Sequence, residues 1–182
     1  MQFKNLALAA SVSAVASAAP SAQSTTFGLV AIHSGSAVQN VAFNAAKSSI
    51  FAGLPSQGAS CARADEQQAT FYLSDGALYL YDTSATPQEI YVDASGMGQG
   101  KIGYTTGAEP APTNSQRTGW TQVDGTLQFG GNDLIACPNS IDGAWSIWAS
   151  AGVANPAGNS DCVSITARVE ETTTPNGCSY TS

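Results

Sequence analysis

Short runs of apolar residues recur along the chain and predict β-strands. The runs cover residues 27–32, 69–73, 78–81, 90–92, 102–104, 126–129, 134–136, 145–148 and 163–169. Several of them alternate apolar with polar positions, as a half-buried strand does. Turn signals such as Asp75-Gly76, Asp124-Gly125 and Asn176-Gly177 separate the runs. The pattern predicts an all-β fold, either a β-sandwich or a β-barrel.

Only the segment 42–52 also fits a short helix. Phe43, Ala46, Ile50 and Phe51 have near-helical spacing there. The spacing leaves a short helix and a non-helical segment equally open for this part of the chain.

A weak internal sequence repeat suggests that part of the fold is repeated. Residues 75–78, Asp-Gly-Ala-Leu, match residues 124–127, Asp-Gly-Thr-Leu, and residues 102–107 line up with 147–152. Repeated units of this kind are the signature of duplicated architectures. Three interpretations fit: a duplicated sandwich half, two lobes of a β-trefoil-like fold with a diverged first lobe, and chance similarity between common Asp-Gly turns.

The segment 88–107 is rich in glycine and invites comparison with nucleotide-binding loops. Ser95 stands where a Walker loop needs its first glycine, and Ile102 follows Lys101 where that loop needs Ser or Thr. A dinucleotide-binding fingerprint that starts at Gly96 needs a third glycine at the position of Lys101. We therefore predict a glycine-rich connection between two strands, and no cofactor-binding residue is assigned.

The first residues have the organisation of a secretory signal peptide. Lys4 gives a basic start, a run of apolar and small residues covers 6–19, and Ala16-Ser17-Ala18 provides a small-residue cleavage site. We expect a signal peptide over residues 1–18 and a single secreted β domain over residues 19–182. We expect no membrane span, since no later run reaches the roughly 18 apolar residues that one needs.

The chain is acidic, with 6 basic and 13 acidic residues and a formal net charge of −7. Loss of Lys4 with the leader leaves 5 basic residues against 13 acidic ones, a net charge of −8. Nucleic acid is excluded as a partner because so few basic residues cannot neutralise a phosphate backbone.

Four cysteines predict two structural disulfides. They are Cys61, Cys137, Cys162 and Cys178, and an even number in a secreted chain favours a disulfide framework. Of the three possible pairings, we prefer Cys137 with Cys162 and Cys61 with Cys178, because Cys137 and Cys162 flank one segment rich in glycine and tryptophan. The spacing lacks Cys-x-x-Cys and the chain has one histidine, so no metal site is expected.

Side chains suited to catalysis are sparse. His33 is the only histidine, and no Gly-x-Ser-x-Gly elbow accompanies it, so a serine-hydrolase triad is not expected. A glycosidase needs two carboxylates, and the candidate pairs are Glu89 with Asp93, Asp124 with Asp133, and Glu170 with Glu171. Most acidic residues occupy turn positions, where they shape the backbone. No catalytic residue is assigned, and we expect a protein that is not an enzyme.

Two tyrosines offer a surface for carbohydrate. Tyr79 and Tyr81 lie two residues apart in one predicted strand and therefore share a face. Leu78 and Leu80 are expected to face the core, which leaves the tyrosines on the outside. Aromatic rings with polar tips can stack on sugar rings, so Tyr79 and Tyr81 are the candidate carbohydrate contacts.

Four long segments carry a family resemblance. They are Phe-Gly-Leu-Val-Ala-Ile-His-Ser-Gly-Ser-Ala-Val-Gln at 27–39, Ala-Ala-Lys-Ser-Ser-Ile-Phe-Ala-Gly-Leu at 45–54, residues 78–107, and the segment from Leu134-Ile-Ala-Cys-Pro through Cys162. On these segments the chain resembles, over its whole length, the fungal cell wall protein PhiA family. The resemblance implies a secreted, wall-associated protein needed for normal phialides and conidia, the asexual spore-bearing structures. It also implies allergenicity and stress protection, which are associated with relatives, and a structural role for the cysteines; it supplies no catalytic residue.

We therefore expect a non-enzymatic wall protein of asexual development. Its expected partners are wall polysaccharide, either glucan or chitin, or wall proteins. One alternative is a carbohydrate-binding secreted module or effector, which retention on insoluble chitin and β-glucan distinguishes. A second alternative is a small secreted glycosidase, which needs two carboxylates that face each other across a groove.

Overall fold

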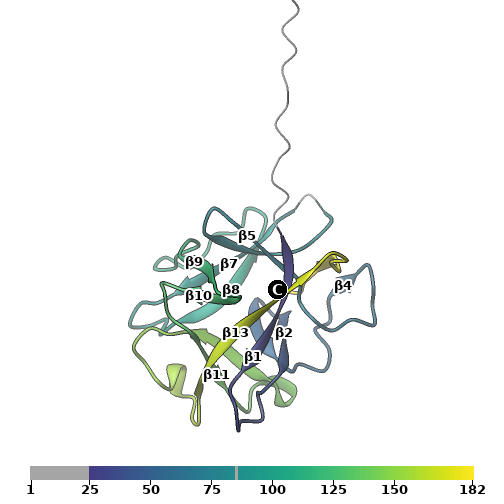
Figure 1. Cartoon of the computed structure of the whole chain (residues 1–182). Coiled ribbons are helices and arrows are strands. Elements are labelled where there is room, and N and C mark those ends of the chain that lie inside the picture. Colours follow the sequence, from purple (N-terminus) through teal and green to yellow (C-terminus); the bar gives the residue numbers. More distant parts are fainter. Residues whose placement is uncertain (1–24, 85) are drawn as a thin grey trace, which may run out of the picture.

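The computed structural model describes residues 25–84 and 86–182, which form β-strands joined by short turns and by longer loops (Figure 1). The strands are β1 (Thr26–Ile32), β2 (Val41–Ala46), β3 (Ser49–Ala52), β4 (Ser60–Cys61), β5 (Phe71–Ser74), β6 (Ala77–Leu80), β7 (Gln88–Asp93), β8 (Lys101–Thr106), β9 (Trp120–Val123), β10 (Thr126–Phe129), β11 (Leu134–Cys137), β12 (Trp145–Ala149), β13 (Val163–Thr172) and β14 (Cys178–Ser179). The all-β prediction is confirmed. The signal peptide predicted over residues 1–18 lies outside the described residues.

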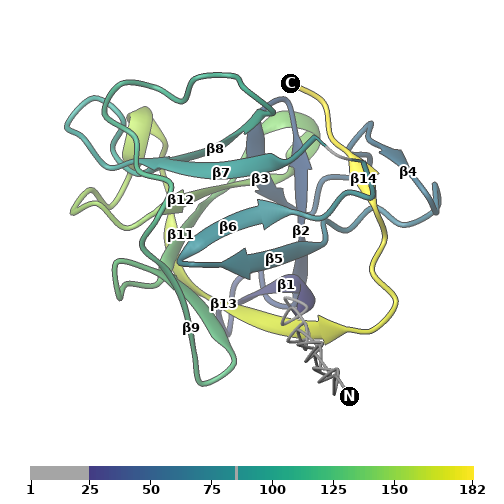
Figure 2. The ribbon, with the colours of Figure 1, turned by 90° about the horizontal axis from the view of Figure 1, so that it is seen from above.

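The strands close into a barrel. β1 pairs along its whole length with β13 near the other end of the chain, from Thr26 opposite Thr172 to Ile32 opposite Thr166. β1 also pairs with β2 and β5, so the large sheet returns on itself. Nine strands form the closed barrel, which can be followed from above in Figure 2. Closure pairs strand edges that an open sheet leaves free, and it decides between the predicted sandwich and barrel in favour of the barrel.

The strand pairing repeats three times, in the manner of a β-trefoil. Three hairpins, β2–β3, β7–β8 and β11–β12, meet through pairings of β3 with β8, β8 with β12 and β12 with β3. The hairpins β5–β6 and β9–β10 turn at Asp75-Gly76 and Asp124-Gly125, and all four of these residues have positive φ. The weak sequence repeat, residues 75–78 with 124–127 and 102–107 with 147–152, therefore reflects equivalent positions in two of the three structural repeats.

Equivalent strands place equivalent side chains at the centre of the barrel. Leu29, Leu78 and Leu127 come from β1, β6 and β10, and all three are buried. The other three buried triplets are Phe43, Ile90 and Leu134; Ile50, Ile102 and Ile147; and Phe71, Trp120 and Ile165. Burial of one such side chain contributes about 1.5 to 3 kcal/mol, so this central cluster is the main source of the barrel's stability.

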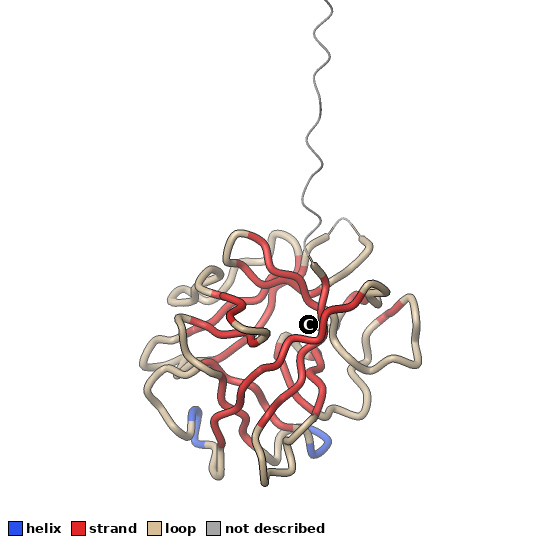
Figure 3. Tube along the Cα trace, in the orientation of Figure 1, coloured by secondary structure: helices blue, strands red, loops and turns tan. Residues whose placement is uncertain are grey.

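The segment 42–52 is a β-hairpin, so a helix there is wrong. β2 and β3 pair from Phe43 opposite Ala52 to Ala46 opposite Ser49, and the turn residues Lys47 and Ser48 both have positive φ. Both faces of this hairpin are largely buried, so its apolar residues do not alternate and periodicity could not identify it. The helical elements among the described residues are two short 3-10 turns, Ile141–Gly143 and Pro156–Gly158 (Figure 3).

The glycine-rich segment connects two paired strands, as predicted. β7 and β8 pair from Gln88 opposite Thr106 to Asp93 opposite Lys101, and residues 94–100 form the connection. A Cβ atom at Gly98 would lie 2.1 Å from the carboxyl carbon of Asp93. The glycine is therefore needed because the chain folds closely over Asp93.

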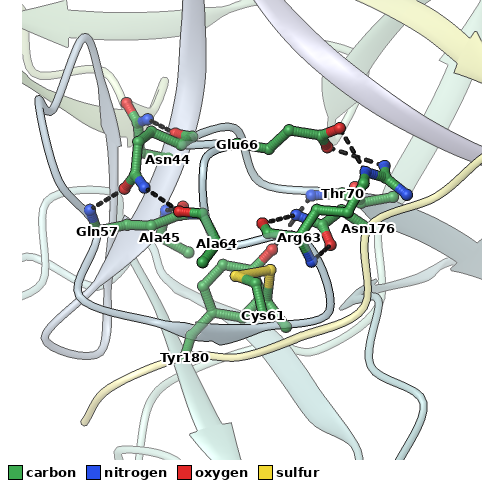
Figure 4. The surroundings of a disulfide bond; sticks show 12 residues. Asn44, Ala45, Gln57, Cys61, Arg63, Ala64, Glu66, Thr70, Asn176 and Tyr180 are labelled. Atoms are coloured by element: carbon green, nitrogen blue, oxygen red, sulfur yellow. Dashed lines mark hydrogen bonds and ion pairs between the residues drawn. A yellow bond between two sulfur atoms is a disulfide. The ribbon is translucent and has the colours of Figure 1, made fainter.

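Both preferred disulfides are confirmed, Cys61–Cys178 and Cys137–Cys162. The first joins β4 to β14, and Figure 4 shows it beside the ring of Tyr180. Tyr180 is buried; its N–H donates to Gln88 Oε1 at 2.8 Å, and its carbonyl accepts from Gln88 Nε2 at 2.9 Å. The bridge and these hydrogen bonds hold the C-terminal segment against the barrel.

No helix in the part of the chain that the structure describes has the length and apolar character needed to cross a membrane.

Candidate functional site

A row of polar and aromatic side chains crosses four neighbouring strands on the outside of the barrel. The register pairs Tyr72 of β5 with Tyr79 of β6, Tyr79 with Glu89 of β7, and Glu89 with Thr105 of β8. Figure 2 shows these strands side by side. Leu78 and Leu80 flank Tyr79 in β6 and are buried, whereas Tyr79 is only half-buried. The predicted orientation of β6 is therefore confirmed. We call this row the tyrosine surface: Tyr72, Tyr79, Glu89 and Thr105.

The two tyrosine rings of this surface stack on each other. Their centroids are 4.9 Å apart and their planes differ by 10°. Such an offset pair contributes about 0.5 to 1.5 kcal/mol beyond its buried area and holds both rings in one orientation. Tyr72 and Tyr79 are half-buried in the row, so part of each ring remains open to solvent.

Glu89 and Arg117 anchor one end of the tyrosine surface. Arg117 Nη1 lies 2.9 Å from Glu89 Oε2, and Arg117 Nη2 donates to Thr105 Oγ1 at 2.8 Å. Tyr79 Oη donates to Glu89 Oε1 at 3.4 Å. Burial, reinforced by the negative charge of Glu89, raises the pKa of both Tyr72 and Tyr79. Both rings are therefore neutral phenols that can donate a hydrogen bond at neutral pH.

Tyr81, the other tyrosine predicted to contact carbohydrate, is half-buried like Tyr79. It follows the last residue of β6; its N–H donates to Thr70 O at 2.8 Å, and its carbonyl accepts from Cys178 N at 3.1 Å. Tyr81 thus helps to attach the C-terminal segment, and the stacking partner of Tyr79 is Tyr72. Sequence reasoning missed Tyr72, although a two-residue turn at Asp75-Gly76 places positions 72 and 79 directly opposite each other.

The carboxylates considered for catalysis have local partners. Glu89 pairs with Arg117, and Glu170 pairs with Arg168 at 2.7 Å. Asp133 accepts from Gln128 Nε2 at 3.0 Å and from Thr166 Oγ1 at 3.2 Å. Asp124 occupies the β9–β10 turn with a φ of 48°. These side chains have evident roles in shaping strands and turns.

His33 also has a structural contact. Its Nδ1 lies 2.6 Å from the carbonyl oxygen of Ser164 and donates to it, since a carbonyl can only accept. This hydrogen bond ties the end of β1 to β13.

A polar network surrounds the Cys61–Cys178 bridge (Figure 4). Arg63 Nε lies 2.5 Å from Glu66 Oε1, and Arg63 Nη2 donates to Glu66 Oε2 at 2.9 Å. Asn176 accepts from the backbone N–H of Arg63 at 2.9 Å and donates to the carbonyl of Arg63 at 2.8 Å. These polar groups pair with one another, so we assign the network a structural role, the stabilisation of the β4–β14 pair.

Comparison with known proteins places the chain in a family. The family model of the PhiA-like secreted proteins matches residues 27–181. A cell wall protein phiA of Aspergillus fumigatus is 70% identical over the full length of both chains, and one of Aspergillus niger is 63% identical over the full length of both. A third, from Arthroderma benhamiae, is 42% identical over 79% of this chain and 81% of its own. No solved structure matches the chain. The chain therefore belongs to the PhiA-like family of secreted cell wall proteins.

Proposed function

We propose that the protein is a non-enzymatic component of the fungal cell wall that acts in asexual development, in the formation of phialides and conidia. Membership of a family of cell wall proteins supports the location. The developmental role, and a role in protection under stress, follow from the resemblance described above. The protein acts by binding within the wall, and its ligand there is glucan or chitin.

The observation that carries the binding proposal is the stacked, solvent-facing pair Tyr72 and Tyr79. A sugar ring has an apolar C–H face and polar edges, and a fixed phenol presents a matching flat face with a hydroxyl at its tip. Arg117 and Glu89 beside the rings offer a charged donor and acceptors to sugar hydroxyls. Tyr81 lies near the end of the same strand and extends the candidate contact.

Retention on insoluble β-glucan and chitin tests this binding. We expect Tyr72→Ala and Tyr79→Ala each to weaken retention by roughly threefold to tenfold, the range expected for loss of one aromatic contact. Tyr79→Phe is the matched control, because it keeps the ring and removes only the hydroxyl. Tyr81→Ala measures whether the contact reaches past β6. Unchanged retention of the Tyr72→Ala/Tyr79→Ala double variant, with an unchanged melting temperature, would rule out the tyrosine surface.

Deletion of the gene tests the developmental role. The deletant should form fewer phialides and conidia, and should tolerate wall stress less well, than the parent strain. The wild-type gene should restore both properties, and the double tyrosine variant should restore them only in part. A deletant with normal conidia, together with a protein that binds glucan or chitin, would instead indicate a carbohydrate-binding module or effector.

A further inference from the structure

A small cleft lies where the glycine-rich connection meets β12, apart from the tyrosine surface. Its volume is about 250 Å³, and its lining includes Tyr91, Asp93, Met97, Lys101, Pro112 and Trp148. Sites for drug-sized ligands usually measure about 300 to 1,000 Å³. The cleft is therefore suited to one small unit, such as a single sugar residue.

Lys101 provides a hydrogen-bond donor in this cleft. Its Nζ donates to Ser49 Oγ at 2.8 Å and lies 5.4 Å from the centre of the Trp148 ring. No carboxylate lies within ion-pair distance of Lys101 among residues 25–84 and 86–182. An ammonium group has three N–H donors, and the hydrogen bond to Ser49 uses one of them. Burial also lowers the pKa of Lys101, because it removes part of the water that would stabilise the charged ammonium group.

Asp93 lines the same cleft but does not neutralise Lys101. The two residues are directly opposite each other in the β7–β8 register, where opposite charges usually attract. The Asp93 side chain instead turns under the glycine-rich connection, and its Oδ1 accepts from the N–H of Ser95 at 3.0 Å. The close approach of Gly98 to the carboxyl group keeps it there. The cleft thus holds an acceptor and a donor that do not form an ion pair with each other.

Apolar groups complete the cleft. Met97 is 93% exposed, and Pro112 is exposed as well. Met97 and Pro112 thus give the cleft an apolar part beside its polar groups. An anion would be repelled by Asp93 and a cation by Lys101. A neutral ring with neighbouring hydroxyls and an apolar face satisfies all of these groups together.

We propose that this cleft binds one neutral sugar residue, with Lys101 donating to one hydroxyl, Asp93 accepting from a neighbouring hydroxyl, and the C–H face of the ring against Met97 and Pro112. The site is separate from the tyrosine surface, and each can bind when the other is altered.

Titration of isotope-labelled protein with methyl β-glucoside, followed by the shifts of its backbone amide signals, tests this assignment. We expect saturable shifts concentrated in residues 93–101 and at Trp148. Lys101→Met keeps the side-chain length and removes the charge, and Asp93→Asn keeps the acceptor for Ser95. Each should weaken binding by about tenfold, in line with loss of one hydrogen bond to a charged group. Lys47→Met is the matched control, because Lys47 is exposed and lies outside the cleft.

Other outcomes would overturn the assignment. Absence of saturable shifts in the cleft, or unchanged affinity in folded Lys101→Met, would show that the cleft does not bind the sugar. Tighter binding of glucuronate or inorganic phosphate than of methyl β-glucoside would show an anion site instead. The Tyr72→Ala/Tyr79→Ala double variant should keep these shifts, so the two sites can fail independently.

Discussion

At residue 100, the backbone has room for no side chain larger than hydrogen. Gly100 has a φ of 93°, and a Cβ there would lie 2.0 Å from the carbonyl oxygen of Ala149. The same backbone contact includes a hydrogen bond from the N–H of Ala149 to Gly100 O at 2.8 Å. This close approach lies beside the pairing of Lys101 in β8 with Trp148 in β12.

Gly100→Ala should therefore destabilise the protein by about 3 kcal/mol or more, since it combines a strained φ with a backbone clash. Gly96→Ala is the control, because no atom lies within 4 Å of a Cβ built at Gly96. It should change the free energy of unfolding by less than about 0.5 kcal/mol. Urea unfolding measures both values. Equal effects of the two substitutions would contradict the close approach.

Tyr180 makes stability depend on pH above neutrality. Burial raises its pKa to about 12 from an ordinary value of 10.0, and burial also raises the pKa of Tyr104, whose ring lies 6.5 Å away. The folded state thus holds these protons more tightly than the unfolded state does. The stability from Tyr180 is complete below pH 10 and is lost as the pH rises to about 12.

The free energy of unfolding should accordingly fall across pH 10 to 12, with Tyr180 accounting for on the order of 2 kcal/mol. Tyr180→Phe removes this titration, so its unfolding midpoint should fall less steeply over the same range. Urea unfolding after a rapid pH jump, which leaves the disulfides intact, provides the comparison. A slope identical to that of the wild type would count against the role of Tyr180.

At the scale of elements, most of the strands could be predicted from the sequence, as could Tyr79, one of the two tyrosines of the tyrosine surface. Strands that bury one face, such as β1 and β10, alternate clearly and were predicted. β2 and β3 bury both faces, so their apolar residues could equally suit a helix. β9 was missed because only Trp120 of its four residues is buried.

The residues at the tyrosine surface could likewise be predicted only in part from the sequence. Tyr79 could be identified from alternation within one strand, whereas Arg117 comes from an irregular segment between β8 and β9. No periodicity locates such a residue. Contacts that depend on how a long connection folds back require the three-dimensional structure.

The two disulfides join cysteines that lie at very different separations along the chain. Cys61–Cys178 spans 117 residues and ties β14 to β4, whereas Cys137–Cys162 spans 25 residues. Loss of loop-closure entropy in the unfolded chain grows with the logarithm of this span. Replacing Cys61 and Cys178 by Ala should therefore cost about 1.4 kcal/mol more than replacing Cys137 and Cys162. Urea unfolding of the two double variants measures the difference; a larger loss from the shorter loop would show that local packing dominates.

At the scale of the whole molecule, the threefold repetition of the barrel makes the three repeats depend on one another. The hairpins β2–β3, β7–β8 and β11–β12 each pair with the other two. The central side chains of all three repeats belong to one buried cluster. No repeat can bury its own apolar face alone, so the barrel should unfold as a single cooperative unit.

Equivalent leucines provide the test of this cooperativity. Leu29→Ala, Leu78→Ala and Leu127→Ala each remove a buried side chain from the same cluster. Each should cost about 2 to 5 kcal/mol and leave a single unfolding transition, because the cavity forms in a core that all repeats share. Val123→Ala is the control, since Val123 is 48% exposed, and it should cost less than about 0.5 kcal/mol. Calorimetry with urea unfolding provides both numbers. A second transition in any one leucine variant, with the other repeats still folded, would mean that the repeats are separate folding units and that the barrel's closure adds little to their stability.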